Sequence, residues 1–309
     1  MIITIMTFLL PVIEIGIPIY LVYRIWMADF TIKAQWLLFS AHALFAMLAM
    51  FLIFRWDVVG YQLRYWLYGG LVIALIASYQ KVADCPFYIY DEIRWSWGKI
   101  SELVLFGASI VWALSGFNPS KKAVDLQYPL EGDSYHVVQG GSSIIINYHG
   151  AFADPQKYAI DINQLNDWGF RASSFQPHQP EKYNVFGDTV YSPVSGIIVQ
   201  ATDKLKDQDP PKRKPSKPAG NHIWIRHDSL YVLLAHLHHG SIRVQKGEQV
   251  KVHQPLAQVG NTGNTTEPHL HIQAVTFPHT KPNADSLLYG GHPIPITFDG
   301  RFLTRNSIF

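Results

Sequence analysis

The sequence predicts two structural regions: a membrane α-helical N-terminal region of about four spans and an all-β C-terminal domain of antiparallel strands. Residues 1–117 consist mainly of long apolar runs, whereas the rest is rich in His, Pro, Gly, Asn and charge. The second part also breaks into short β-branched or alternating segments that turn residues separate, a pattern typical of all-β domains. A chain of 309 residues is long enough for one or two domains.

The N-terminal region contains four apolar segments, at residues 2–26, 34–54, 65–79 and 100–117. The first, second and fourth segments approach the roughly 20 residues that a helix needs to cross a bilayer. The segment 65–79 reaches that length only if it is extended at both ends. Side chains such as Arg24 and Trp26 mark segment ends, as is typical of a membrane interface. We therefore expect an integral multi-pass protein of the cytoplasmic membrane, in contact with the lipid bilayer.

The orientation follows from the charges around the spans. No Lys or Arg precedes the first segment, which disfavours a cytoplasmic N-terminus. Four spans would then return the chain to the outer side. The soluble domain is therefore expected on the extracytoplasmic side.

The rest of the chain divides into a polar connector at 118–139 and a β domain at 140–309. Strands are expected at 142–147, 158–162, 189–191, 196–201, 222–227, 231–237, 249–252, 256–259 and 269–275. Asp228 and Ser229 predict a hairpin turn between two of them. A Lys-, Asp- and Pro-rich stretch near 203–218 has almost no apolar content, which indicates an exposed, mobile insertion.

Charge and cysteine content exclude two kinds of site. The formal net charge of +2 is too small for the concentrated basic face that nucleic-acid binding needs, so no nucleic-acid partner is expected. The single cysteine, Cys85, excludes both an intrachain disulfide and a cysteine-based zinc site. Any metal must therefore be held by His, Asp or Glu.

Four residues in the β domain have side chains suited to metal chemistry. His269 and His271 are two apart in an expected strand and so share one face. His236 ends another apolar strand, and Asp161 is a lone carboxylate among apolar neighbours, which is costly to bury unless it is paired or metal-bound. Each residue alone is more simply explained as a surface or hydrogen-bonded structural side chain. Their joint occurrence in this order favours a site.

The order and context of these residues resemble the lysostaphin-type (LytM-like) zinc metallopeptidases. The resemblance covers about residues 158–275, and its ordered blocks are 186–196 (FGDTVYSPVSG), 220–227 (GNHIWIRH), 234–237 (LAHL), 244–250 (VQKGEQV), 259–265 (VGNTGNT) and 268–271 (PHLH). It implies a compact antiparallel β fold of the duplicated-hybrid-motif type and cleavage of peptides in bacterial cell-wall peptidoglycan.

The resemblance also implies roles for individual residues. Asp161 and His271 would be Zn²⁺ ligands, and His236 and His269 would be the catalytic pair. Two His, one carboxylate and a water molecule suit a catalytic zinc with an open fourth position. The zinc would polarise the scissile carbonyl, and the histidines would move protons or stabilise the oxyanion.

One position departs from the family pattern. The first His of the family's HxxxD motif would fall at Lys157, and lysine is a poor zinc ligand. His149 is a candidate replacement, because a loop from 149 to 161 could return it to the metal. The alternative is that His149 is a loop histidine without a role.

The leading functional interpretation is a membrane-anchored zinc metalloendopeptidase that hydrolyses peptide bonds in peptidoglycan. The alternative is a weak or inactive LytM-like domain that binds the cell wall or regulates another hydrolase, and Lys157 is the feature that favours it. A transporter is disfavoured by the sparse polar content of the spans. The sequence does not indicate an oligomeric state.

Overall fold

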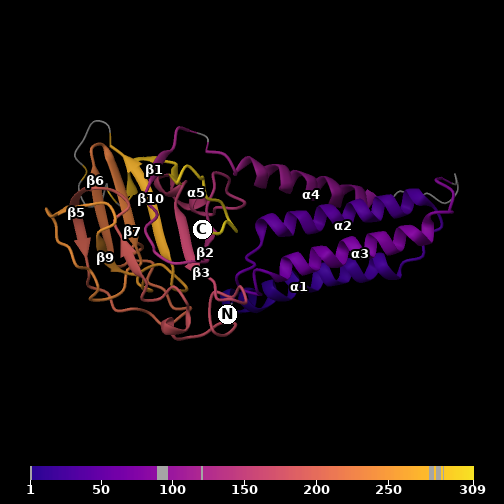
Figure 1. Ribbon diagram of the computed structural model, residues 1–309, viewed down its shortest axis with the longest axis horizontal. Helices are drawn as coiled ribbons and strands as arrows, with labels where there is room; N and C mark the ends of the chain where they lie inside the picture. Colours follow the sequence, from indigo (N-terminus) through magenta and orange to yellow (C-terminus); the bar gives the residue numbers. More distant parts are fainter. Residues whose placement is uncertain (1, 89–96, 120, 278–281, 283–286, 288) are drawn as a thin grey trace. The chain divides into compact units, whose positions relative to one another are not determined.

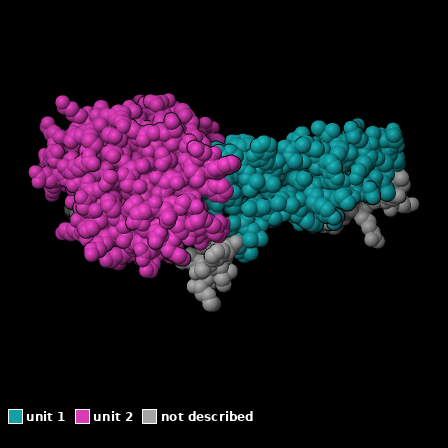
Figure 2. All heavy atoms as spheres, turned by 60° about the horizontal axis from the view of Figure 1, so that its bottom comes forward, with its two compact units in different colours: residues 1–114 teal, residues 115–309 magenta. Residues whose placement is uncertain are grey.

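The computed structural model describes the chain except for residues 1, 89–96, 120, 278–281, 283–286 and 288. The chain divides into two compact units, residues 1–114 and 115–309 (Figure 2). The first unit is helical and the second is built mainly of β-strands (Figure 1).

The N-terminal unit contains α1 (Ile2–Met27), α2 (Lys33–Ile53), α3 (Leu63–Val82) and α4 (Trp97–Ser115). Helices α1, α2 and α3 share one apolar core, formed by Leu21, Ile25, Ala43, Ala46, Met47, Leu71 and Ala74. The alanines leave room for close helix–helix approach, which is how helices pack in a bilayer. Other apolar side chains, such as Val12 and Val111, are largely exposed, as expected for surfaces that face lipid.

Three helices in the described part of the chain are long and apolar enough to cross a membrane: Leu9–Met27, Lys33–Ile53 and Gly98–Ser115. The third predicted segment, 65–79, is also helical and is extended at both ends in α3. Its mean hydropathy is lower because these extensions add Arg64 and Lys81. The expected count of about four spans is therefore approximate.

The C-terminal unit is organised around one antiparallel sheet, so the predicted antiparallel β fold is confirmed. Its strand order is β2-β3-β10-β7-β6-β5-β8, and β11 also pairs with β10. The strands are β2 (Tyr135–Gln139), β3 (Ile160–Gln164), β5 (Gly196–Thr202), β6 (His222–His227), β7 (Leu230–Ala235), β8 (Gln249–Val250), β10 (Leu270–Thr276) and β11 (His292–Ile294). Two small pairs complete the unit: β4 (Thr189–Tyr191) with β9 (Pro255–Gln258), and β1 (Val124–Leu126) parallel to β12 (Ile296–Phe298).

Alternation along the strands gives the sheet two different faces. Leu270, Ile272 and Ala274 of β10 enter the main apolar core, which also contains residues of β6, β7 and β9. His271 and Gln273 therefore point to the opposite face. This second face is the one that carries the polar side chains of the site.

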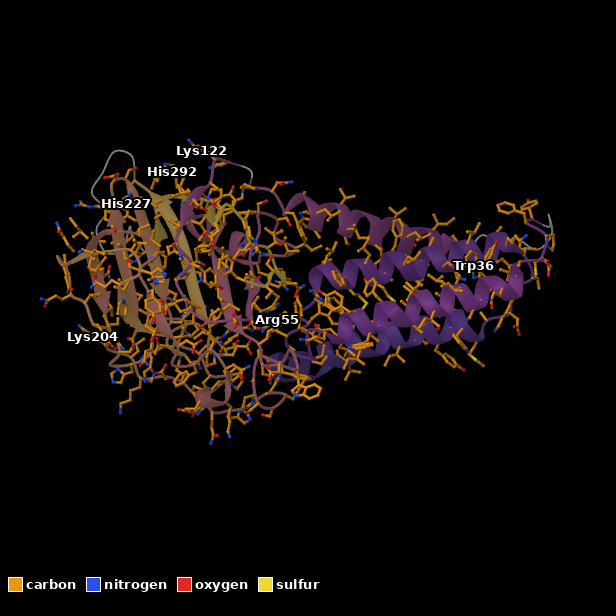
Figure 3. All side chains as sticks on the ribbon, in the orientation of Figure 1. Trp36, Arg55, Lys122, Lys204, His227 and His292 are labelled. Carbon is orange, nitrogen blue, oxygen red and sulfur yellow. The ribbon has the colours of Figure 1, made fainter. Side chains whose placement is uncertain are left out.

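The hairpin between β6 and β7 confirms the predicted turn. His227 pairs with Leu230, and Asp228 has a φ of 52°. Asp tolerates this left-handed conformation better than most residues, which explains its place in a two-residue turn. His227, at the end of β6, is labelled in Figure 3.

The predicted strand at 142–147 is wrong. These residues form turns, in which the backbone N–H groups of Ile146 and Asn147 both donate to the carbonyl of Ser143. Asn147 then directs its side chain to three backbone carbonyls, which a strand could not place around one side chain. The helix α5 (His149–Phe152) follows directly, and the short 3-10 helices η1 (Asp154–Gln156) and η2 (Pro180–Lys182) come later.

The expected connector 118–139 contributes two strands, β1 and β2. Tyr135 and Val137 of β2 are buried, because β3 lies beside them in the sheet. Strand β2 depends on that long-range partner, and the polar composition of the segment gave no sign of it.

Strand β5 ends at residue 202, and residues 203–218 contain no helix or strand. The first half is attached to the rest of the unit: the Asp203 carboxylate accepts from the N–H of Gly240, and that of Asp207 from the N–H of Asn261. Residues 211–217 are exposed. The segment thus has an anchored first half and a solvent-facing second half.

Candidate metal centre

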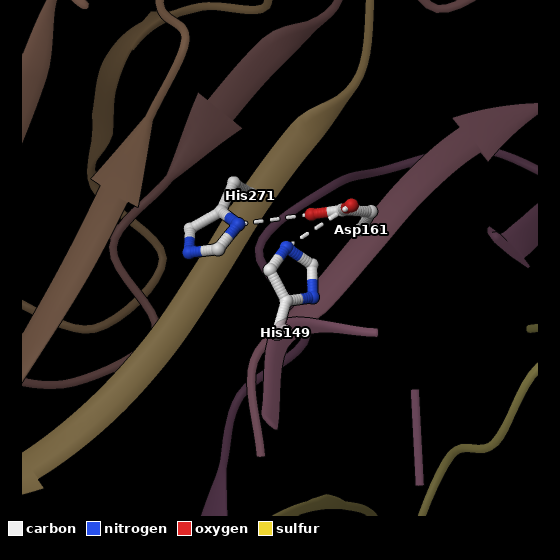
Figure 4. A group of neighbouring side chains, drawn as sticks. All are labelled: His149, Asp161 and His271. Atoms are coloured by element: carbon white, nitrogen blue, oxygen red, sulfur yellow. Dashed lines mark hydrogen bonds and ion pairs between the residues drawn. The ribbon is translucent and has the colours of Figure 1, made fainter. Parts of the chain in front are cut away.

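The pairing of β3 with β10 brings Asp161 and His271 together. The two residues are direct partners in the antiparallel register, so their side chains lie on the same face. His271 Nδ1 is 2.9 Å from Asp161 Oδ1, and both side chains are buried (Figure 4).

His149 reaches the same point from the first residue of α5. Its Nε2 lies 3.4 Å from Asp161 Oδ2, and its ring is 4.9 Å from the ring of His271 (Figure 4). One ligand atom from each of His149, Asp161 and His271 lies within 4.8 Å of the others. The structure therefore brings together the three residues that were expected as ligands, and they form one group of potential metal ligands among the described residues.

Side-chain carbonyls orient both histidine rings of this group. His149 Nδ1 donates to Asn147 Oδ1 at 3.0 Å, which leaves Nε2 directed at Asp161. His271 Nε2 donates to Gln273 Oε1 at 3.0 Å, which leaves Nδ1 directed at Asp161. A second hydrogen bond of this kind is how metal-binding histidines are usually held in one orientation.

The electrostatics favour an ionised carboxylate beside a neutral His149. Burial by itself raises the pKa of the Asp161 carboxyl, but the imidazoles of His149, His269 and His271 outweigh it and hold this pKa well below its usual range. Burial, partly opposed by Asp161, lowers the pKa of His149 to about 4. An ionised carboxylate and an unprotonated imidazole are the forms in which these groups bind metals.

His271 differs from His149. Burial alone would lower its pKa, but the hydrogen bond to Asp161 and the charge of this carboxylate raise it. In the metal-free chain both ring nitrogens have acceptors as partners, which suits an imidazolium. A metal at Nδ1 would take the place of that proton.

His236 and His269 lie next to this group. Their rings are 4.8 Å apart, and the ring of His236 is 5.7 Å from that of His271. His269 Nε2 lies 3.5 Å from Asp161 Oδ1. The two expected catalytic histidines and the three expected ligands therefore gather at one place.

Backbone carbonyls of one loop set the orientation of this histidine pair. His236 Nδ1 donates to Thr262 O at 2.8 Å, and His269 Nδ1 donates to Glu267 O at 2.9 Å. Each ring thus keeps Nε2 available. Burial, followed by the nearby His269 and His271, lowers the pKa of His236 well below its usual value, so this ring is neutral near pH 7.

Lys157 takes no part in the group. Its Nζ lies 5.5 Å from the centroid of the Tyr158 ring, and the ligand group contains His149 instead. The Lys157 ammonium thus lies against Tyr158, and His149 provides the histidine nitrogen that the HxxxD pattern would place at position 157.

Sequence reasoning missed the residues that support this geometry. Gln273 was detectable, because it lies two residues after His271 and so shares its face. Asn147 fell in the segment assigned to a strand. Arg305, whose guanidinium donates to Ile146 O and Gln139 Oε1, is far from the site in sequence and gave no signal.

Comparison with known proteins supports a peptidase domain. Residues 177–282 match the model of peptidase family M23. The peptidoglycan DD-endopeptidase ShyA of Vibrio cholerae is 28% identical over 184 residues, which cover 55% of this chain and 36% of ShyA. The peptidoglycan DD-endopeptidase ShyB of the same organism is 44% identical over 57 residues, 18% of this chain and 13% of ShyB.

A solved structure, a zinc-containing peptidase from Vibrio cholerae, is 23% identical with a TM-score of 0.30, over 50% of this chain and 37% of the other. The chain spans about a third or less of the length of the curated relatives it matches. His236, His269 and His271 lie inside the matched range, whereas His149 and Asp161 precede it. Residues 177–282 of the chain therefore form a domain of peptidase family M23, and this range includes His236, His269 and His271 of the site.

Proposed function

We propose that the protein is a membrane-anchored zinc endopeptidase that hydrolyses peptide bonds in peptidoglycan. One observation carries the proposal: His149, Asp161 and His271 direct ligand atoms at one another, and His236 and His269 lie beside them. The names of the relatives support peptidoglycan as the substrate. The apolar helices support the membrane anchor.

The three proposed ligands fit zinc. A tetrahedral Zn²⁺ ion with bonds of about 2 Å holds its ligand atoms roughly 3.3 Å apart. In the structure, Asp161 oxygens lie 2.9 Å from His271 Nδ1 and 3.4 Å from His149 Nε2. Two nitrogens and one carboxylate oxygen also leave a fourth position for water or substrate, as in catalytic zinc sites.

Zinc, when bound, would supply a Lewis acid that polarises a carbonyl and makes water nucleophilic near neutral pH. The remaining chemistry belongs to His236 and His269. Because a backbone carbonyl holds each Nδ1–H, each ring in its neutral form offers Nε2 as a base. A ring that has taken up a proton at Nε2 can donate it to the leaving amine or to the oxyanion.

The domain is proposed to act on the extracytoplasmic side of the cytoplasmic membrane. The peptidoglycan DD-endopeptidases among the relatives support this side, because peptidoglycan lies outside the cytoplasmic membrane. An anchored enzyme acts only on substrate within reach of the membrane surface.

The proposal is tested with the full chain purified in detergent. Metal analysis should find one zinc per chain, and the protein should release peptide fragments from purified peptidoglycan. A chelator should abolish the release of fragments, and added zinc should restore it. The variant His271→Ala serves as the control and should release no fragments. Zinc-independent binding to peptidoglycan without cleavage would instead support the non-catalytic, regulatory function.

A further inference from the structure

His149 sits on a segment with an elaborate support of its own. Asn147, buried to 1% exposure, donates from Nδ2 to the carbonyls of Gly141 and Ala159 at 2.9 and 3.0 Å. Its Oδ1 accepts from Nδ1 of His149 at 3.0 Å and from its backbone N–H at 3.3 Å. One amide thus connects the His149 ring to the turn before it and to the residue that enters β3.

Arg305 supports the same segment from the other end of the chain. Its side chain is buried, Nε donates to Ile146 O at 2.9 Å, and the guanidinium carbon lies 4.8 Å from the centroid of the Tyr148 ring. Its Nη2 donates at 2.7 Å to Gln139 Oε1, which also accepts from the N–H of Tyr148 at 3.0 Å. Arg305 therefore contacts the residues on both sides of Asn147.

The backbone of the C-terminal tail holds Arg305 in this place. The N–H of Asn306 donates to Val137 O at 2.9 Å, and Phe309 and Tyr135 exchange two backbone hydrogen bonds. The tail therefore runs along β2. A Cβ at Gly140 would meet Leu303 O at 2.9 Å, so glycine permits this close approach of the two backbones.

We propose that Asn147 and Arg305 are positioning residues for His149, and that the C-terminal tail is a structural part of the metal centre. The inference rests on the proposed zinc function, with His149 as a ligand. A buried guanidinium is costly unless its N–H groups find acceptors, and Arg305 uses the acceptors of the segment that presents His149. Gln139, Asn147 and Arg305 all lie outside the M23 match at 177–282.

The contacts give these two residues separate tasks. Asn147 sets which nitrogen of His149 faces Asp161. Arg305 sets the path of the backbone from Ile146 to Tyr148, and so the position of the His149 Cα. Partners of metal ligands typically contribute about 10–100-fold to metal affinity, and this range is expected for both residues.

The experiment measures zinc affinity by competition with a chromogenic chelator, on the full chain in detergent. Asn147→Ala and Arg305→Gln should each weaken zinc binding by about 10–100-fold. The visible spectrum of the Co²⁺-loaded chain should also change in both variants, because an altered ligand position alters the coordination geometry.

Two controls separate positioning from general destabilisation. Arg213→Gln removes an exposed arginine charge from the 203–218 segment, away from the C-terminal tail, and should leave zinc affinity unchanged. Val190→Ala removes core packing in β4 and should lower the melting temperature of the metal-free chain without changing zinc affinity. If Arg305→Gln does not fold, Gln139→Met tests the same support by removing the shared acceptor.

The outcomes distinguish this inference from the function on which it rests. A wild-type chain that binds no zinc would overturn the proposed metal centre. Wild-type binding together with unchanged affinity and Co²⁺ spectra in Asn147→Ala and Arg305→Gln, or in Gln139→Met if it replaces the latter, would overturn the positioning role alone.

Discussion

The two halves of the site are built in different ways. His236, His269 and His271 lie within the M23 match, at the end of β7 and around the start of β10. Their orienting partners Thr262, Glu267 and Gln273 lie within the same match. His149 is the first residue of a four-residue helix. The preceding turns, the side chain of Asn147 and the distant Arg305 hold this residue in place. One half of this site therefore lies in recognisable motifs, and the other half is supplied by segments that carry none.

The largest expected effect tests whether both halves bind the metal. His149→Ala and His271→Ala should each lose stoichiometric zinc, by more than the roughly hundredfold that the loss of a ligand's partner costs. Metal analysis of the two variants, with His253→Ala as an exposed control, provides the measurement. Full zinc content in His149→Ala would show that His149 is not a zinc ligand.

The second effect concerns the histidines that are not ligands. His236→Ala and His269→Ala should keep zinc but lower kcat by about 10²–10⁴-fold, the usual contribution of a general acid or base. Cleavage rates on purified peptidoglycan peptides and zinc content, measured on the same samples, check this. A loss of zinc in either variant would move that residue into the ligand group.

The third effect is on the pH dependence of stability in the metal-free chain. His149 and His236 have lowered pKa values when folded, so between about pH 6.5 and 4 the unfolded chain binds protons that the folded chain does not. Stability should therefore fall as the pH falls through this range. His271, with its raised pKa, has the opposite sign, and its contribution is lost as the pH rises through the folded value.

Thermal unfolding of the metal-free chain across this pH range measures the effect, and His149→Asn provides the comparison. The variant should show a shallower decline toward pH 4, because it no longer has that titrating group. Identical profiles for the two proteins would mean that His149 is not buried as a neutral imidazole.

The smallest expected effect is at Lys157. Lys157→Ala should leave zinc content unchanged and change the free energy of unfolding by about 1 kcal/mol or less, a typical effect of a single substitution at a half-buried position. Metal analysis and denaturant unfolding check both values. Loss of zinc in this variant would show that Lys157 contributes to the metal site.

The fold shows the same division between local and distant determinants. Strands β5, β6, β7 and β10 were predictable, because alternation and turn residues specify them locally. Strand β2 and the turns at 142–147 were not, because β2 depends on β3 and the turns depend on the contacts of Asn147 with residues that follow them.

The helical and β regions, the common face of His269 and His271, and the candidate ligands could all be predicted from the sequence. Periodicity and short motifs suffice for these, since they depend on neighbours within a few residues. Three features became visible only in the folded chain: the Lys157 ammonium lies against Tyr158, His149 reaches Asp161, and Arg305 supports the segment that carries His149. Each of these depends on packing between segments far apart in the chain, which local sequence patterns do not encode.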